Sequence, residues 1–529
     1  MLAPDVFKRL NPLTAVKQEM STRNRLLPRR WDYVSLAGNA EAVERWLRPR
    51  LRRGDVGSLT DVVFADKGWR GARPLNVMAL EDRVLYRALV NLVAEALPVA
   101  LRQRPAVAGF RQAPFQVEQV RYVTKTDITA YYEFVDHQVL ADELIAQTGE
   151  EPAVVALMDL LARMMGRHVG LPQVHVSSDV LGDTYIDPVR RRLLRRGLDI
   201  FTYSDDFLIA TATLGAARNA IEECAAEVRT LGLVLNERKT LTYRIHNYSE
   251  SLGAYAAAEK RLFTDERHSS DDLSLLEDDY GDLDVSDEGV EEALALGEAP
   301  VDSDVDDAEA IVQDDEPQAT PDDLAERRAG AASRAWDLWF LGDESEETQS
   351  GRDVAVTQSL LQRALPALGA AADRRPLDRL TMLLQNEPAL TPQVAEYLTA
   401  YGATGKSARK SIRSALDDVV GQDIFSPWQC MWLAEAAGVL RTAGTRHHPH
   451  IDWLVQCVAT APAALAATAA AALGRLRVGD PAVLAAALDR VGPEWRQLVL
   501  WGLARLDAVA ALAAAEHELD RILIAAVES

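Results

Sequence analysis

Three aspartates within apolar, strand-like segments are the residues of this sequence best suited to chemistry. Asp205 and Asp206 follow Tyr203-Ser204 between the apolar runs DIF and FLIA, and Asp127 lies within KTDITAYY. Burying such carboxylates is costly unless a cation neutralises them. The Asp pair alone is equally compatible with a surface hairpin in which both residues form a turn. The second strand shifts this balance, because pairing of the two strands would bring Asp127 and Asp205 to one place.

A group of hard oxygen ligands of this kind predicts a magnesium site. Mg²⁺ prefers one or two carboxylates together with substrate phosphates. Two Mg²⁺ ions, or Mn²⁺ in their place, could activate a 3′-hydroxyl and stabilise a departing pyrophosphate during in-line attack. The residue types therefore indicate phosphoryl transfer.

Short strands and helices alternate around these aspartates. Residues 79–102 have apolar side chains at helical spacing, whereas the β-branched and aromatic runs at 122–132 and 199–211 are typical of buried strands. This mixture predicts an α+β domain. Further helices are expected at 137–147, 152–166 and 214–231.

The net charge of the chain has a local origin. The whole chain carries −23, and residues 265–326 alone carry −24, with one Arg against 25 acidic residues. The rest is close to neutral, so the acidity does not argue against a nucleic-acid partner. The composition of this segment predicts a disordered linker. An acidic mimic that occupies a basic nucleic-acid groove is the alternative.

The sequence after the acidic segment is helical throughout. Ala/Leu-rich stretches of about a dozen residues, punctuated by Gly, Asp or Pro, resemble a HEAT-like α-solenoid, with a compact bundle as the alternative. Four parts are therefore expected along the chain. They are an N-terminal helical extension at 1–60, an α+β domain at 61–260, the acidic segment at 261–326 and a helical repeat domain at 327–529.

Six motifs in order resemble the fingers and palm of reverse transcriptases over residues 60–256. TDITAYYEFVDH resembles motif A, GLPQVHVSSDVLGDTYIDPV motif B, YSDDFLIA motif C, and LGLVLNERKT motif D, with SLGAY after it. Upstream, DKGWRGARPLNVMALEDRVLYRAL resembles the fingers segment, and AGFRQAP the Gly-Phe-Arg stretch that contains Arg111. The resemblance implies a right-hand polymerase fold, RNA-directed DNA polymerase activity, dNTP substrates and RNA or DNA partners.

The resemblance also implies roles for individual residues. Asp127, Asp205 and Asp206 would be metal ligands with the backbone carbonyl of Ile128, and Lys239 would be a candidate acid for the departing pyrophosphate. Tyr132 matches the steric gate that favours deoxynucleotides, with a core aromatic as the alternative. The nucleotide-binding positions would be Lys67, Arg73, Tyr132 and Gln173.

Motif B departs from the family pattern. Gly170-Leu171-Pro172-Gln173 is intact, but Val174 and His175 stand where a Gly usually follows the Gln. That Gly allows close backbone approach to the base pair or template, so ordinary template handling is in doubt. His175 is expected to be a loop histidine.

Several clusters remain outside these motifs. Basic residues after motif B, led by Arg190 and Arg191, would suit phosphate contacts or a solvated helix face. Lys406, Arg409, Lys410 and Arg413 fall on one helix face and form a second candidate for nucleic-acid binding. GATGKS at 402–407 fails as a P-loop because Ala400 occupies the first Gly position. RHHPH, with His447, His448 and His450, is interpreted as a loop.

A helical repeat directly after the palm is similar to the abortive-infection and defence-associated bacterial reverse transcriptases. That similarity implies antiphage defence, synthesis without a conventional template, priming from a protein tyrosine with DNA attached to the protein, and oligomers. Tyr33 is the weak candidate for priming. There are two alternatives. One is a polymerase-like scaffold whose repeat binds RNA or protein, and the other is a retron or group II type of reverse transcriptase.

The sequence also predicts a cytoplasmic location. It has three cysteines without CxxC spacing, no secretory signal and no membrane span.

Overall fold

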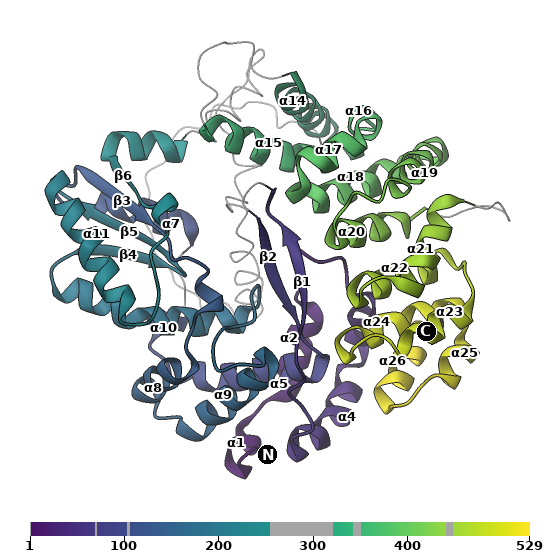
Figure 1. Cartoon of the computed structure of the whole chain (residues 1–529), viewed down its shortest axis with the longest axis horizontal. Coiled ribbons are helices and arrows are strands. Elements are labelled where there is room, and N and C mark those ends of the chain that lie inside the picture. Colours follow the sequence, from purple (N-terminus) through teal and green to yellow (C-terminus); the bar gives the residue numbers. More distant parts are fainter. Residues whose placement is uncertain are drawn as a thin grey trace, which may run out of the picture.

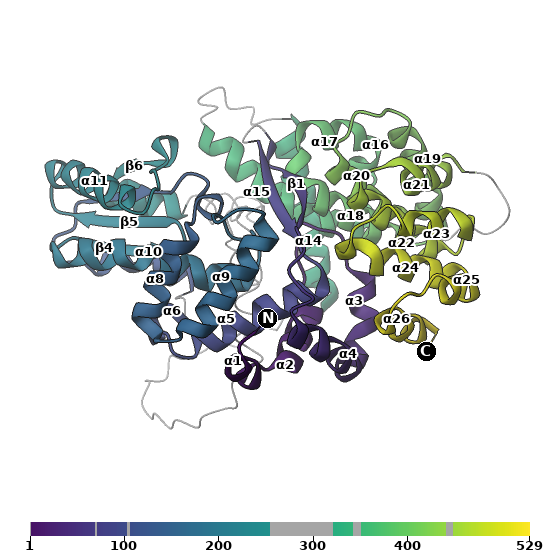
Figure 2. The same ribbon diagram turned by 60° about the horizontal axis from the view of Figure 1, so that its bottom comes forward.

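The molecule has a sheet-containing part and an arc of helices, joined by N-terminal helices and a β-hairpin (Figure 1). The computed structural model describes residues 2–68, 71–102, 106–253, 321–341, 351–440 and 448–528. The four-stranded sheet lies on one side and helices α14 to α26 on the other, in both views of the ribbon (Figures 1 and 2). Within the described residues, no helix is both long and apolar enough to cross a membrane.

The chain begins with short helices that pack beneath the hairpin. These are α1 (Pro4–Arg9), α2 (Pro12–Ser21), α3 (Trp31–Leu36), η1 (Ala37–Asn39) and α4 (Ala40–Arg53). Pro at the first position suits the starts of α1 and α2, because a helix leaves that N–H unpaired in any case. Gly54, at φ 81°, ends α4 in the left-handed conformation that favours glycine.

A two-stranded antiparallel sheet and a buried helix follow. Strands β1 (Asp61–Asp66) and β2 (Ala72–Val77) pair with each other. The helix predicted at 79–102 forms, but as α5 (Leu80–Ala94) and α6 (Val99–Arg102). Pro98 explains the break, since it lacks an N–H and disfavours helical geometry in the residue before it. Next come α7 (Val107–Gln112) and η3 (Ala113–Gln116).

The second sheet has four antiparallel strands in the order β4-β5-β3-β6. The strands are β3 (Tyr122–Thr126), β4 (Asp199–Tyr203), β5 (Asp206–Thr211) and β6 (Leu241–Arg244). The apolar run at 199–211 is therefore a hairpin of two strands, and the run at 122–132 leaves the sheet after Thr126. The three predicted helices are confirmed. The helical elements are η4 (Tyr131–Glu133), α8 (His137–Thr148), α9 (Glu151–Met165), α10 (Val176–Arg195), α11 (Leu214–Arg229) and η5 (Glu237–Lys239).

The two faces of this sheet are covered differently. Phe207 and Ile209 belong to the main core, which also contains residues of α10 and α11. Tyr203 and Leu208 belong instead to a small separate cluster with Phe110 of α7 and Tyr248, which lies in a helix at 245–253. One face thus carries the structural core, and the other is only partly covered.

The C-terminal part is helical, as expected. Within the predicted acidic segment, residues 261–320 lie outside the described residues, and helix α14 includes 321–326. Gly474 of α22 faces Gly502 of α24, where a Cβ on Gly474 would come within 2.5 Å of the Gly502 carbonyl oxygen, so these helices approach closely. The helices are α14 (Pro321–Leu341), α15 (Gly351–Ala370), α16 (Arg375–Asp378), α17 (Leu380–Asn386), η8 (Pro388–Leu390), α18 (Thr391–Ala403), α19 (Lys406–Val420), α20 (Pro427–Ala437), α21 (Pro449–Thr460), α22 (Ala463–Leu476), α23 (Pro481–Leu488), α24 (Pro493–Leu506), α25 (Ala508–Ala513) and α26 (Glu518–Glu528).

Tryptophans join the C-terminal helices to the N-terminal part of the chain. The rings of Trp31 and Trp501 stack with centroids 5.9 Å apart. Trp428 Nε1 donates to the Leu26 carbonyl oxygen at 2.6 Å, and Trp495 Nε1 donates to Asp61 Oδ2 at 2.7 Å. Large, partly polar aromatic side chains of this kind dominate stable interfaces. The helical arc is therefore fixed to the N-terminal helices and to strand β1.

Candidate active site

The register of β3 and β5 brings the predicted aspartates together. Thr126 pairs with Phe207, so Asp127 stands opposite Asp206 at the end of the ladder. Residues directly opposite in an antiparallel pair project from the same face. Ser204 and Asp205 form the two-residue turn between β4 and β5, because Tyr203 pairs with Asp206. The three aspartates therefore meet at one end of the sheet.

Asp127 is a buried carboxylate with polar partners from one neighbouring loop. Its side chain is 5% exposed, and Asn236 Nδ2 donates to its Oδ2 at 3.1 Å. The backbone N–H of Asn236 also donates to the Asp127 carbonyl oxygen at 2.7 Å. Lys239 Nζ lies 3.2 Å from the same Oδ2, and its side chain is 50% exposed. Asn236 thus fixes the position of Asp127, and Lys239 neutralises it.

The backbone around Ile128 directs its carbonyl toward the hairpin tip. Ile128 bridges to Leu235 through two flanking bonds, from Thr129 N to the Val234 oxygen and from Asn236 N to the Asp127 oxygen. In this antiparallel pattern the N–H and C=O of the central residue point away from that partner. The Ile128 carbonyl therefore points to the side of β5, where Asp205 and Asp206 lie.

These donors fit a divalent cation of the magnesium class. Carboxylates and a backbone carbonyl are the hard oxygen ligands that Mg²⁺ prefers. A buried carboxylate needs a compensating charge, and here Lys239 supplies it from a half-exposed position. Because the lysine can turn out to water, its place near Oδ2 is compatible with replacement by an ion.

Tyr132 connects the three segments that surround the aspartates. It lies in η4, and its hydroxyl donates to Asp179 Oδ1 of α10 at 2.6 Å. The same hydroxyl lies 3.0 Å from Ser204 Oγ in the β4–β5 turn. The ring is half-buried. Its hydroxyl therefore fixes the ring at a point where the Asp127 segment, α10 and the hairpin tip meet.

Left-handed backbone recurs around this site in residues other than glycine. Ala130, Val174 and Ser204 have φ values of 48°, 58° and 51°. The position at which the family pattern has Gly thus keeps glycine-like geometry although Val174 occupies it. A β-branched residue in this region is strained, and such strain gathers at functional sites. Gln173, just before it, donates to Glu133 Oε1 at 3.1 Å.

Two substitutions at Val174 should separate strain from packing. Val174→Gly and Val174→Ala both remove the apolar side chain, but only glycine adopts φ 58° freely. We expect Val174→Gly to have the higher free energy of unfolding, by about 1 kcal/mol. Urea titrations of both variants would measure this difference. Equal stability, or a more stable Ala variant, would contradict the strain.

His175 is a buried structural residue rather than a loop histidine. It caps α10, with Nδ1 accepting from the Ser177 N–H at 3.2 Å, and Nε2 lies 3.2 Å from Glu19 Oε1. Arg83 and Arg87 also pair with Glu19, each at 2.6 Å. Burial lowers the pKa of His175 to about 4. For Glu19, burial alone would raise the pKa, but Arg87 and Arg83 hold it well below its ordinary value.

The depressed pKa of His175 predicts a pH dependence of stability. The unfolded chain takes up a proton near pH 6.5, whereas the folded His175 does so only near pH 4. The free energy of unfolding should therefore fall by up to about 3 kcal/mol as pH decreases from 6.5 to 4. Urea titrations at several pH values measure this slope. His175→Asn, which can still cap the helix, should reduce it, and an unchanged slope would assign the effect to other groups.

Three predicted cations remain, Arg111, Lys67 and Arg73, and they lie on different elements. Tyr248 Oη donates to the Arg111 carbonyl oxygen at 2.9 Å. Burial raises the pKa of Tyr248 to about 12, with Arg111 acting against this shift and Asp206 adding to it, so both charges are near the ring. Lys67 and Arg73 lie on a different sheet, at the tip of β1 and β2. The Lys67 N–H donates to the Gly71 carbonyl oxygen, and Arg73 lies opposite Ala65 in the β1–β2 ladder.

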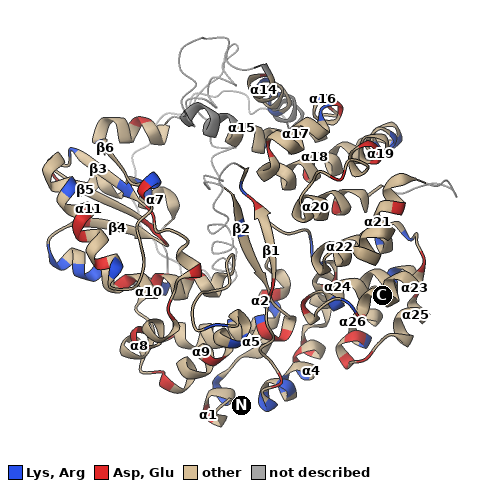
Figure 3. Ribbon diagram, viewed as in Figure 1, with Lys and Arg blue, Asp and Glu red and all other residues tan. Residues whose placement is uncertain are grey.

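Two basic clusters were predicted to bind nucleic acid, one on α10 and one on α19. The α10 cluster forms local ion pairs, and the α19 cluster lies on an outer helix. Arg190 pairs with Asp187 at 2.6 Å, and Arg191 pairs with Asp187 at 2.7 Å and with Glu143. Basic and acidic residues are interspersed around α10 and α11 (Figure 3). The helix with Lys406, Arg409, Lys410 and Arg413 is α19, on the outer side of the arc (Figures 1 and 2). Nucleic-acid contact by either cluster stays a prediction.

The sequence did not predict the roles of three residues, Asn236, Asp179 and Glu19. Asn236 lies within LGLVLNERKT, where an Asn before a short helix suggests a cap rather than a partner for Asp127. Asp179, a partner of Tyr132, lies in VSSDV without any distinguishing neighbour. Glu19 lies in a helix far from every motif, so only its full burial reveals its role.

Comparison with known proteins bears directly on this geometry. Residues 65–264 match the family model described as reverse transcriptase (RNA-dependent DNA polymerase). No curated protein shows significant sequence similarity to the chain. Among solved structures, telomerase from Candida tropicalis with a fragment of telomeric RNA aligns over 76% of this chain and 68% of its own, at 10% identity and a TM-score of 0.30. The apo telomerase of C. tropicalis aligns over 75% and 72%, at 10% identity and a TM-score of 0.28, and likeness at this level does not define a common fold. Residues 65–264 are thus a reverse transcriptase domain, and the chain is an RNA-directed DNA polymerase by virtue of that domain.

Proposed function

We propose that the chain joins deoxynucleotides by two-metal phosphoryl transfer at Asp127, Asp205 and Asp206, with the Ile128 carbonyl as a further ligand. The β3–β5 register, which puts Asp127 opposite Asp206 beside the Asp205 turn, carries this proposal. Two bound Mg²⁺ or Mn²⁺ ions would supply an activated hydroxyl nucleophile and charge stabilisation for the leaving pyrophosphate.

The protein's own residues position the reactants. Asn236 holds the Asp127 carboxylate, and Lys239 lies next to it on a side chain that is half exposed. When an ion compensates Asp127, the Lys239 ammonium is available to neutralise the departing pyrophosphate or to protonate it. Lys67 and Arg73, on the β1–β2 sheet, would bind the triphosphate through phosphate oxygens, and Gln173 would contact the nucleotide.

Tyr132 is proposed to select the sugar. Its hydroxyl is fixed by Asp179 and Ser204, so the ring has a defined position beside the Asp127 segment. We expect Tyr132→Ala to reduce the preference for dNTP over rNTP by at least about tenfold, because a clash with the 2′-OH worth 1.4 kcal/mol or more would be lost. Incorporation assays with both nucleotide types measure this ratio.

Tyr132→Phe is the matched control for the gate. It keeps the ring, which would clash with the 2′-OH, and removes only the hydroxyl with its contacts to Asp179 and Ser204, so most of the preference for dNTP over rNTP should remain. A preference that survives in Tyr132→Ala would show that Tyr132 is a core aromatic.

We further propose that the chain is of the defence-associated bacterial type, in which helical repeats take the place of a thumb. Helices α14 to α26 follow the reverse transcriptase domain in the sequence and pack on the N-terminal helices and on β1. In this proposal the helices form a HEAT-like repeat, and synthesis uses RNA, DNA or no conventional template. Val174 in strained backbone is compatible with altered template handling. Protein priming, attachment of DNA to the chain, homo-oligomers and a cytoplasmic location in antiphage defence are parts of the same proposal.

One assay tests these points together. Purified full-length protein is incubated with Mg²⁺ or Mn²⁺ and labelled dNTPs or rNTPs, with and without a primed RNA template. The product is analysed after denaturation, with and without protease treatment. Incorporation with the template supports the polymerase proposal, and product that stays attached to protein supports protein priming. The absence of any product with Mg²⁺ and Mn²⁺ would refute the polymerase proposal. Template-dependent product that is free of protein would refute the template-independent, protein-primed part.

A further inference from the structure

The junction between α19 and α21 brings one carboxylate and two imidazoles together, far from the polymerase residues. Asp417 lies in α19, His448 precedes α21, and His450 lies in its first turn. Each residue offers a ligand atom, and these atoms lie within 4.8 Å of one another. The segment RHHPH was expected to be a loop, whereas His450 begins a helix and is fully buried. His447 lies outside the described residues.

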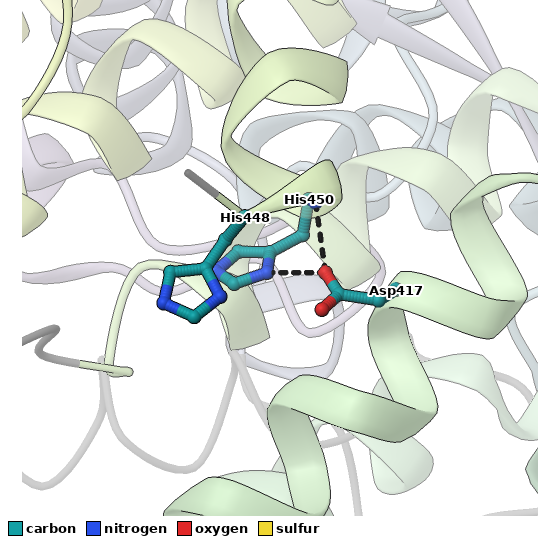
Figure 4. A group of neighbouring side chains, drawn as sticks. All are labelled: Asp417, His448 and His450. Carbon is teal, nitrogen blue, oxygen red and sulfur yellow. Dashed lines mark hydrogen bonds and ion pairs between the residues drawn. The ribbon is translucent and has the colours of Figure 1, made fainter. Parts of the chain in front are cut away.

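Asp417 fixes the orientation of His450. The Asp417 Oδ1 atom accepts from the backbone N–H of His450 at 2.9 Å and lies 2.6 Å from His450 Nδ1. Figure 4 shows both contacts, with the carboxylate on one side of the His450 ring. Since an ionised carboxylate only accepts, Nδ1 carries the proton of the neutral ring. The second ring nitrogen, Nε2, therefore carries a free lone pair.

The lone pair on His450 Nε2 is buried and makes no hydrogen bond with any of the residues that the structure describes. Nearly all buried polar atoms in proteins have a partner, so such a nitrogen calls for a specific reason. The His448 ring stacks against the His450 ring with centroids 5.4 Å apart and adds two further nitrogens next to it (Figure 4). Neutral imidazole nitrogens held in place by a carboxylate are a frequent arrangement at metal sites.

We propose that His448 and His450 bind a divalent metal ion of the zinc class, with Asp417 orienting His450 and supplying compensating negative charge. Zinc combines readily with imidazole nitrogen in a tetrahedral site whose remaining positions water can fill. An ion at this place would fix the start of α21, where His450 is already held to α19 by Asp417. Arg413, one turn before Asp417, brings an opposing positive charge near His450.

Zinc binding by the full-length protein tests the proposal independently of polymerase activity. The protein is freed of any affinity tag, stripped with chelator and kept in excess Mg²⁺, so that the polymerase aspartates are occupied. Calorimetric titration with ZnCl₂ and elemental analysis should then give one zinc ion per chain. Co²⁺ in place of zinc should give the visible absorption of nitrogen-ligated, four-coordinate cobalt.

Point variants localise the bound ion. His448→Ala, at a partly exposed position, removes a ligand and should weaken zinc binding about tenfold or more. Asp417→Asn should weaken it by a similar factor, because loss of an orienting partner usually costs roughly 10–100-fold in affinity. Arg413→Gln should tighten binding, since it removes the opposing charge. His517→Ala is the matched control, because this exposed histidine also lies beside a carboxylate, that of Glu516. No zinc uptake by the wild type, or equal uptake by His448→Ala and Asp417→Asn, would overturn the proposal.

Discussion

Asp205→Asn is expected to reduce dNTP incorporation by on the order of 10²–10³-fold or more, with the fold unchanged. Asn keeps the size and one oxygen of Asp but loses the charge that holds a divalent cation. Asp205 lies in the β4–β5 turn, on the side to which the Ile128 carbonyl points, so this change acts within the candidate site. The turn geometry rests on Ser204 at φ 51° and not on Asp205, so the hairpin should survive.

Asp199→Asn provides the matched control for this prediction. Asp199 is exposed at the start of β4, on the same hairpin and away from the turn. Steady-state incorporation of labelled dNTP, measured with far-UV circular dichroism of both variants, gives the comparison. We expect the control to retain wild-type activity. Substantial synthesis by Asp205→Asn would refute the two-metal proposal, and equal loss in both variants would indicate that the hairpin itself had been damaged.

The sequence predicts the aspartates of the candidate active site because local pattern and chemistry agree there. Asp127 and Asp205 stand out as charges within apolar runs, whereas the two-residue turn at Ser204 and Asp205 comes from the structure. The pairing partner of each strand is a long-range property, however. The match of Asp127 with Asp206 rests on a register between segments about 80 residues apart, which the structure supplies.

Other parts of the site could not be predicted because their partners are distant in sequence. Glu19 meets Arg87, 68 residues later, and His175 still further on. Asp417 meets His450 across 33 residues that include a turn and another helix. In each case a single charged residue on a helix has no periodic or turn signal of its own. Its burial is decided by how helices pack, and that packing depends on the whole chain.

Burial makes Glu19 the residue whose substitution should cost the most stability. Its side chain is 0% exposed, and Arg83, Arg87 and His175 all contact its carboxylate. Removing one partner of a buried ion pair leaves the other charge uncompensated, which typically costs 3–5 kcal/mol. We therefore expect Glu19→Gln to lower the free energy of unfolding by about that amount. Urea titration at pH 7 measures it.

Two further variants show whether the loss comes from the uncompensated charge. Glu41→Gln is the matched control, since Glu41 pairs with Lys17 at the surface and such pairs contribute about 0–1 kcal/mol. In the double variant Glu19→Gln with Arg87→Met, one of the stranded cations is gone, so part of the lost stability should return. A double variant less stable than either single one would contradict this account.

Because His175 caps the helix that follows Gln173, the Glu19 cluster connects the N-terminal helix α2 to the segment that borders the candidate active site. Helix α2 therefore packs against the reverse transcriptase domain, although the family match begins only at residue 65.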